Sequence, residues 1–156
     1  MKEIRWHARA GQGAKTASQL LAVALLESGK SVQAFPEYGP ERRGAPLRAF
    51  TRYDDRPIRR HDSVTTPDVV VVLEPSLRHE PYVTAGLKSG GFVLDATELG
   101  ASRESTNLFM VGVVAGALGE PPLTTLQDAA VQLLGRKVEP DSIRAAIAAG
   151  HTKAQR

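Results

Sequence analysis

The sequence predicts a single-domain α/β fold in which a largely parallel, twisted sheet is flanked by helices. Segments with strand-like and helix-like periodicity alternate along the chain, and glycine or proline separates them. The run from Val69 to Leu73 is continuously aliphatic, as in strands that are buried on both faces of a parallel sheet. Glu74, Pro75 and Ser76 follow its carboxyl end, the place where open α/β sheets bind ligands. With 156 residues, the chain is long enough for one core of substantial size.

Hydrophobic periodicity and turn residues place the elements in order. The expected strands cover residues 3–8, 31–34, 47–53, 58–63, 69–73 and 92–94. The expected helices cover residues 15–28, 82–87, 107–118, 124–134 and 140–150. Thr124 and Gln127 have the spacing of a capping box at a helix start, and Gly150 is interpreted as the end of the last helix. The domain is therefore predicted to span residues 1–150, with residues 151–156 as a frayed tail.

Two helices differ from the usual amphipathic pattern. Apolar residues in the helix at 15–28 extend well beyond one face, so this helix is expected to be covered on two sides. The helix at 107–118 is apolar along nearly its whole length, which is typical of a buried helix.

Composition excludes several kinds of chemistry for this chain. Cysteine is absent, so disulfides, thiolate zinc sites and iron–sulfur ligation by this chain are excluded. His7, Glu37 and Glu41 have no paired spacing, and no catalytic or metal-binding residue is assigned. The 20 basic and 17 acidic residues are too balanced to indicate nucleic-acid binding. No apolar run approaches the roughly 18 residues of a membrane span, and a cytoplasmic location is expected.

The turn Gly11-Gln12-Gly13 is a candidate anion-binding site. It lies between a strand and a helix, where free backbone N–H groups can receive a phosphate or carboxylate. The third glycine of the dinucleotide fingerprint is missing, and no acidic residue ends the second strand, so a classical NAD site is not expected. A tight turn that needs small residues for close packing remains an equal alternative.

The stretch at residues 35–46 is the most unusual part of the chain, because its prolines and glycines specify a rigid, irregular backbone between two strands. We interpret it as an interface or ligand loop, and the alternative is a solvated connection with satisfied Glu/Arg pairs. The candidate residues are Pro36, Glu37, Gly39, Pro40, Glu41, Arg42, Arg43 and Gly44. In the next strand Arg48, Phe50 and Arg52 share one face, which suits an interface or anionic ligand, or an edge strand protected by charge.

These features together resemble the gamma subunit, or gamma domain, of 2-oxoacid:ferredoxin oxidoreductases, including pyruvate:ferredoxin oxidoreductase. The similarity lies in residues 4–13, 32–46 and 68–73, with a weaker match at 107–110. It implies a Rossmann-like fold for residues 1–150. Ala8 and Ala10 stand where the family usually has glycine. The region between Gly91 and Asn107 is shorter than usual, which predicts a shortened sheet edge.

The resemblance implies a non-redox subunit of a multi-subunit oxidoreductase, not catalytic alone, that packs on the thiamine-binding and iron–sulfur subunits. Thiamine diphosphate, iron–sulfur clusters and CoA are expected in that complex, with ferredoxin as its acceptor, and no cofactor is expected in this chain. Gly11, Gln12 and Gly13 are candidates for a CoA contact. The alternative function is a stand-alone CoA- or nucleotide-binding domain. A homodimer of the isolated chain is expected from the helix at 15–28 and the Arg/Phe face of the strand at 47–53.

Overall fold

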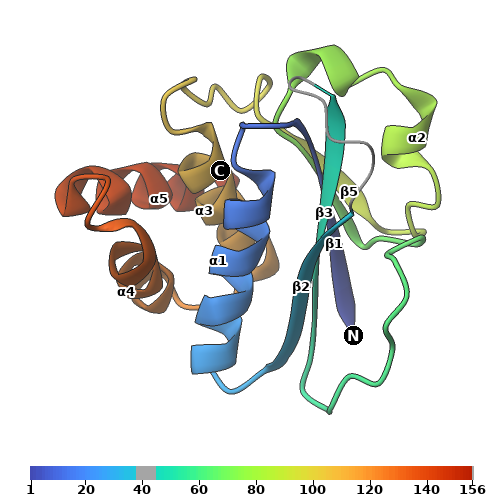
Figure 1. Cartoon of the computed structure of the whole chain (residues 1–156), viewed down its shortest axis with the longest axis horizontal. Coiled ribbons are helices and arrows are strands. Elements are labelled where there is room, and N and C mark those ends of the chain that lie inside the picture. The colour runs from blue at the N-terminus through green and yellow to red at the C-terminus, as the bar shows by residue number, and fades with distance from the viewer. Residues whose placement is uncertain (38–44, 156) are drawn as a thin grey trace.

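A five-stranded sheet in the order β2-β3-β1-β4-β5 lies at the centre of the fold (Figure 1). The structure, a computed structural model, describes residues 1–37 and 45–155. Strands β1, β2, β4 and β5 point in one direction, and β3 runs antiparallel between β2 and β1. The prediction of an α/β fold with flanking helices is confirmed, and the sheet is mixed, with two parallel and two antiparallel pairings. The strands are β1 (Lys2–Arg9), β2 (Ser31–Glu37), β3 (Pro46–Asp54), β4 (Val69–Val72) and β5 (Phe92–Asp95).

Four helices cover one face of the sheet, and short helical turns lie on the other (Figure 1). Side chains alternate along β1, so Ile4 and Trp6 enter the main core on the helical face. Val70 and Val72 of β4 instead form a smaller cluster with Leu77 on the opposite face. The large helices are α1 (Ala14–Glu27), α3 (Thr106–Leu118), α4 (Leu123–Leu134) and α5 (Pro140–Ala154), and the short turns are η1 (Pro75–Leu77) and α2 (Pro81–Thr84).

Helix α3 is held unusually close to α5. A Cβ added to Gly112 would overlap the carbonyl oxygen of Ile147, and one added to Gly150 would overlap that of Phe109. Gly150 therefore does not end the last helix, which continues to Ala154 and makes most of the expected tail helical. The sequence prediction was wrong because a glycine needed for close helix packing has the same local signature as a helix stop.

Two further local predictions were wrong for similar reasons. No strand forms at residues 58–63, where the backbone instead covers sheet side chains and the carbonyl oxygen of Asp62 accepts from Arg52 at 3.0 Å. The capping box does not form either, because α4 begins at Leu123 after Pro122. The Gln127 side chain donates to the carbonyl oxygen of Arg144 on α5 at 3.0 Å.

The arginine-bearing face of β3 is largely internal. Phe50 and Arg52 are fully buried, since β3 lies between two other strands and is not an edge strand. The Arg52 guanidinium donates to the Glu3 carboxylate at 3.0 Å and to Gln33 Oε1 at 2.9 Å. Helix α1 is likewise buried against the sheet, α3 and α4. The two surfaces on which the homodimer prediction rested are thus mostly buried within the chain.

In the described part of the chain, no helix combines the length and apolarity needed to cross a bilayer. The predicted shortened edge corresponds to β5, a four-residue strand that ends the sheet.

Candidate functional site

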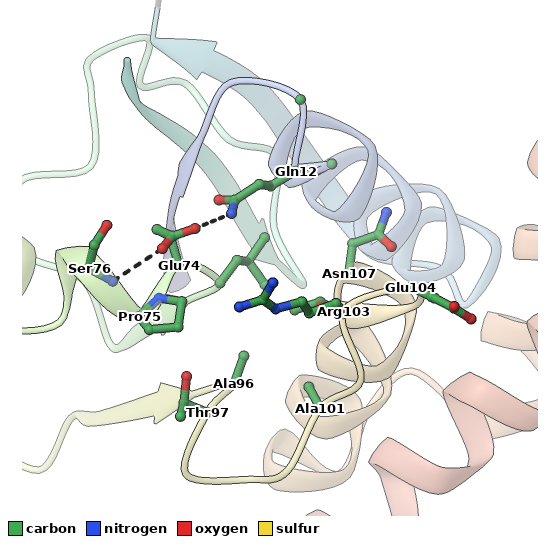
Figure 2. A pocket seen from close by; sticks show the side chains of 14 residues that line it. Gln12, Glu74, Pro75, Ser76, Ala96, Thr97, Ala101, Arg103, Glu104 and Asn107 are labelled. Atoms are coloured by element: carbon green, nitrogen blue, oxygen red, sulfur yellow. Dashed lines mark hydrogen bonds between the residues drawn. The ribbon is translucent and has the colours of Figure 1, made fainter. Parts of the chain in front are cut away.

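A cavity of about 910 Å³ opens at the carboxyl ends of β1, β4 and β5 (Figure 2). The chain leaves β1 toward α1 on one face of the sheet, and it leaves β4 toward η1 and α2 on the other face. Ligands of open α/β sheets bind at such a switch point, and the volume is in the range of small-molecule sites. The lining residues come from the turn at 11–13, from 73–76 after β4, and from the 96–107 segment after β5.

The turn Gly11-Gln12-Gly13 forms one wall, as the sequence predicted for an anion contact. Gly13 is the N-cap of α1 with φ of 84°, and it offers no side-chain cap. The first intrahelical backbone bond is made by Ala17 to the Gly13 carbonyl at 2.9 Å, so the N–H groups before Ala17 have no helical partner. The first turn has no acidic residue, so the positive end of the helix dipole is not neutralised there.

A second helix begins at the same cavity. Helix α3 has Ser105 as its N-cap without a side-chain hydrogen bond, and its first turn has no acidic residue. The Leu108 N–H donates to Asn107 Oδ1 at 3.0 Å, so this helix start is capped in part by its own side chain. The two helix starts are in contact, because a Cβ on Gly13 would lie 2.5 Å from Nδ2 of Asn107. Gly13 is thus required both by its positive φ and by this close approach. The two interpretations of the glycine turn, a tightly packed turn and an anion-binding helix start, therefore apply to the same residues.

One basic side chain extends toward the opposite wall of the cavity. Figure 2 shows Arg103 directed from the segment before α3 toward Glu74 and Pro75, whereas Glu104 points away. No salt bridge of Arg103 occurs among the residues that the structure describes. A guanidinium group beside the uncapped start of α1 and the partly capped start of α3 gives the cavity the groups that bind phosphate or carboxylate.

Gln12 links the ends of β1 and β4. Its Oε1 accepts from the Arg9 backbone N–H at 2.6 Å, and its amide nitrogen donates to the Glu74 carboxylate. The other Glu74 oxygen accepts from the Ser76 backbone N–H at 3.2 Å, and Arg9 donates to the Ser76 hydroxyl at 3.0 and 3.1 Å. Partial burial opposes ionisation of Glu74, but the hydrogen bonds from Gln12 and Ser76 lower its pKa overall. Gln12 therefore fixes the wall of the cavity and is not free to bind a ligand with both ends.

The predicted ligand loop starts at the same edge of the sheet but is described only in part. Pro36 and Glu37 end β2, whereas Gly39, Pro40, Glu41, Arg42, Arg43 and Gly44 lie outside the described residues. Nε and Nη2 of Arg48 each donate to one oxygen of the Glu37 carboxylate, and Nη2 lies 2.6 Å from Oε1. The Ala10 backbone N–H donates to the Ala45 carbonyl at 3.1 Å, so the chain after the loop passes next to the glycine turn. Neither Pro36 nor Glu37 lines the cavity.

His7, the histidine nearest to the glycine turn in sequence, lies on the other face of the sheet. It is fully buried, and its Nε2 accepts from Arg5 Nε at 3.0 Å. Burial, followed by the charges of Arg5 and Arg48, lowers the pKa of His7 to about 3. A histidine that is neutral near pH 7 but sealed from solvent has no access to a substrate in the cavity.

Sequence reasoning indicated two of the three walls of the cavity. It predicted the glycine turn, and it placed Glu74, Pro75 and Ser76 at the carboxyl end of a strand, where open α/β sheets bind ligands. It missed the third wall. Arg103 and Asn107 lie in a polar connection, and nothing local to them indicates that they approach Gly13. Within the described residues no group of His, Asp or Glu has the arrangement of a metal site.

Comparison with known proteins agrees with this architecture. Residues 3–100 match the family model described as pyruvate ferredoxin/flavodoxin oxidoreductase. The common gamma subunit of the pyruvate/ketoisovalerate oxidoreductases of Thermococcus kodakarensis is 48% identical over 151 residues, covering 95% of this chain and 77% of that protein. Pyruvate synthase subunit PorC of Thermotoga maritima is 41% identical over 169 aligned positions, covering 92% of this chain and 88% of PorC.

Solved structures extend the comparison to the fold. The crystal structure of the Thermotoga maritima subunit PORC superposes with a TM-score of 0.81 and 35% identity, covering 97% of this chain and 95% of that one. A 2-oxoglutarate:ferredoxin oxidoreductase from Magnetococcus marinus, solved with coenzyme A bound, shares the fold with a TM-score of 0.67 at 20% identity. The superposition covers 99% of this chain and 31% of the Magnetococcus chain. The chain belongs to the pyruvate ferredoxin/flavodoxin oxidoreductase family.

Proposed function

We propose that this chain is the gamma subunit of a pyruvate-type 2-oxoacid:ferredoxin oxidoreductase complex, in which it holds the phosphate groups of CoA and performs no redox step itself. The similarity to gamma subunits over 95% of the chain supports the first part. The observation that supports the second part is the convergence of the uncapped start of α1, the start of α3 and Arg103 on one cavity. In this proposal the electron carriers belong to the other subunits, and ferredoxin is the acceptor of the complex.

The residues of the chain fit CoA better than they fit the other groups expected in the complex. A chain without cysteine has no thiolates for an iron–sulfur cluster. The described residues likewise present no acidic cluster for the metal ion that accompanies a diphosphate. The cavity instead presents backbone N–H groups and one guanidinium, which are ligands for phosphate oxygens.

In this proposal Arg103 and the helix starts of α1 and α3 bind and orient the anionic end of CoA. The Gln12–Glu74 hydrogen bond keeps the glycine turn at a fixed distance from the end of β4, so the N–H groups before Ala17 stay directed to the cavity. The bound CoA supplies the thiol that accepts the acyl group in the complex. The 36–44 loop supplies contacts to a neighbouring subunit.

The test is the Arg103→Ala variant in the assembled complex. Loss of a charge-assisted hydrogen bond of about 1.5–3 kcal/mol corresponds to a rise of roughly 10- to 150-fold in the KM for CoA. The KM for the 2-oxoacid should stay unchanged. Arg136→Ala is the matched control, because it removes the same charge from the exposed connection between α4 and α5. An unchanged KM for CoA in the Arg103 variant would exclude the cavity as the CoA phosphate site.

The alternative is a stand-alone CoA- or nucleotide-binding domain, which the glycine turn and Arg103 at one cavity also support. Calorimetric titration of the isolated chain with CoA distinguishes the two. We expect weak binding that becomes at least about tenfold tighter in the complex, since CoA spans subunits in our proposal. Equal affinity in both states would favour the stand-alone domain.

A further inference from the structure

Strand β5 ends the sheet with one edge unpaired. It pairs with β4 on one side, and no other strand in the described part of the chain lies on its outer side. Natural proteins usually protect such edges with lysine, proline or a bulge. β5 reads Phe-Val-Leu-Asp, and its one charged residue, Asp95, is buried. The short strand and the buried charge limit pairing at the Asp95 end, but Val93, at the middle of the edge, has no lysine, proline or charge beside it.

The backbone of β5 defines which groups face outward. The N–H of Phe92 donates to the Asp68 carbonyl at 3.1 Å, and that of Ala96 donates to the Val72 carbonyl at 2.9 Å. In a parallel ladder, residues alternate between the two neighbouring strands. The N–H and C=O groups of Val93 and the N–H of Asp95 are consequently directed to the open edge, whereas the Asp95 carbonyl accepts from the Leu99 N–H at 3.0 Å.

Apolar side chains accompany these groups on both faces. Phe92 and Val93 are 36% and 38% exposed and lie on opposite faces of β5, because side chains alternate along a strand. Leu94 lies on the same face as Phe92 and packs partly against the main core. A partner strand would cover apolar surface above and below the sheet at once.

We propose that the β5 strands of two copies of this chain pair antiparallel about a two-fold axis at Val93, joining the two sheets into one of ten strands. This register follows from the outward groups, because the two Val93 residues can exchange both of their backbone hydrogen bonds. It also places Asp95 opposite Gly91 of the second copy, where the Asp95 N–H can donate to the Gly91 carbonyl. Phe92 of each copy then lies opposite Leu94 of the other.

A second copy fits this edge because the strand is complementary to itself in that register, both in hydrogen bonds and in apolar side chains. A further observation concerns relatives that are longer. The alignment with Thermotoga PorC has 169 positions but covers 92% of the 156 residues here, or about 144, so about 25 positions have no counterpart in this chain. The sequence predicts that this loss falls after Leu94, next to the open edge. The proposal is independent of the CoA proposal.

A single cysteine provides the test, because the chain has none of its own. A hydrogen-bonded antiparallel pair has its Cα atoms about 5.5 Å apart, which is within disulfide range. Val93→Cys should form a disulfide-linked dimer under mild oxidation at least about tenfold faster than Leu133→Cys, which places the thiol on exposed α4. Equal rates for the two variants would overturn the proposal.

Sedimentation of the cysteine-free chain gives the second readout. The wild type should show a concentration-dependent dimer, and Val93→Pro should raise its dissociation constant at least about tenfold by removing two of four backbone hydrogen bonds. Proline is tolerated on an edge strand when the lost N–H faces outward, so the β4–β5 pairing is retained. A strictly monomeric wild type would contradict the proposal. So would a Val93→Cys crosslink to another subunit of the complex in place of a second copy.

Discussion

Replacing Gly13 by alanine tests the convergence of the two helix starts, on which the site depends. Gly13 has φ of 84°, a conformation that costs an L-residue about 1–2 kcal/mol. The new Cβ would also lie 2.5 Å from Nδ2 and 3.0 Å from Cγ of Asn107, so that side chain must move. Crowding of this kind costs about 1–3 kcal/mol, and the lower value applies because an amide at the end of a side chain can shift. The expected loss in the free energy of unfolding is about 2–3 kcal/mol.

Gly11→Ala is the matched control for this prediction. Gly11 has a similar φ of 92°, but no atom lies within 4 Å of its added Cβ. It should therefore lose about 1–2 kcal/mol from the backbone conformation alone. The difference between the two variants isolates the contact with Asn107. In an Asn107→Ala background, Gly13→Ala should recover about 1 kcal/mol, because the crowded amide is gone.

Urea unfolding of the four variants, followed by circular dichroism, measures these free energies. CoA titration of the same proteins reports whether the displaced Asn107 narrows the cavity. Equal losses for Gly11→Ala and Gly13→Ala, with no recovery in the Asn107→Ala background, would refute the contact between the starts of α1 and α3.

Three other predictions concern packing, pH dependence and the loop. Gly150→Ala should destabilise the fold by about 2 kcal/mol or more, because the added Cβ would overlap the Phe109 carbonyl oxygen. In an open helix the same change stabilises by about 1 kcal/mol. A rise in the urea midpoint would therefore contradict the close α3–α5 packing. The folded-state pKa of His7 is lowered to about 3, so its contribution to stability is complete above about pH 6.5 and declines as the pH falls toward 3. The wild type should lose about 2 kcal/mol more than His7→Gln between pH 7.5 and pH 5, and parallel pH profiles in urea titrations would contradict this. Changing Arg42 and Arg43 together to alanine should alter the unfolding free energy by no more than about 1 kcal/mol. The same change should weaken complex assembly, measured by titration of the partner subunits, or CoA-dependent turnover, measured by kinetics, by roughly 2 kcal/mol or more. Unchanged assembly and turnover would show that the loop is only a structural connection.

Periodicity was sufficient for the elements whose environment is uniform along their length. The continuous aliphatic run that became β4 and the nearly all-apolar helix that became α3 are buried on every side, and no competing interaction altered them. Local glycine and capping signals were less reliable. Gly150 and the Thr124/Gln127 pair have the expected residue types, but α3 and α5 use those positions for tertiary contacts.

Two of the three parts of the candidate site could be predicted, since Glu74, Pro75 and Ser76 follow the carboxyl end of the most clearly predicted strand. Gly11, Gln12 and Gly13 were found because the strand, turn and helix that form an anion site are consecutive in sequence. Arg103 and Asn107 reach the same cavity only after the chain has passed through β4 and β5, and that proximity comes from tertiary folding. For Arg48 and Arg52, by contrast, the sequence suggested an interface or ligand contact where the structure shows mainly contacts within the chain. They share a strand face, as predicted, but most of their donors bind carboxylates, amides and carbonyls of the same chain.

The central claim is that this chain acts as one subunit of a larger oxidoreductase. The most direct measurement is purification of the tagged chain from its native host, with mass spectrometry of the associated proteins and a 2-oxoacid-dependent viologen assay on the same sample. We expect thiamine-binding and iron–sulfur subunits in stoichiometric amounts. We also expect 2-oxoacid oxidation by the complex and no such activity in the chain after it is separated. Recovery of the chain without such subunits, or 2-oxoacid oxidation by the separated chain, would contradict it.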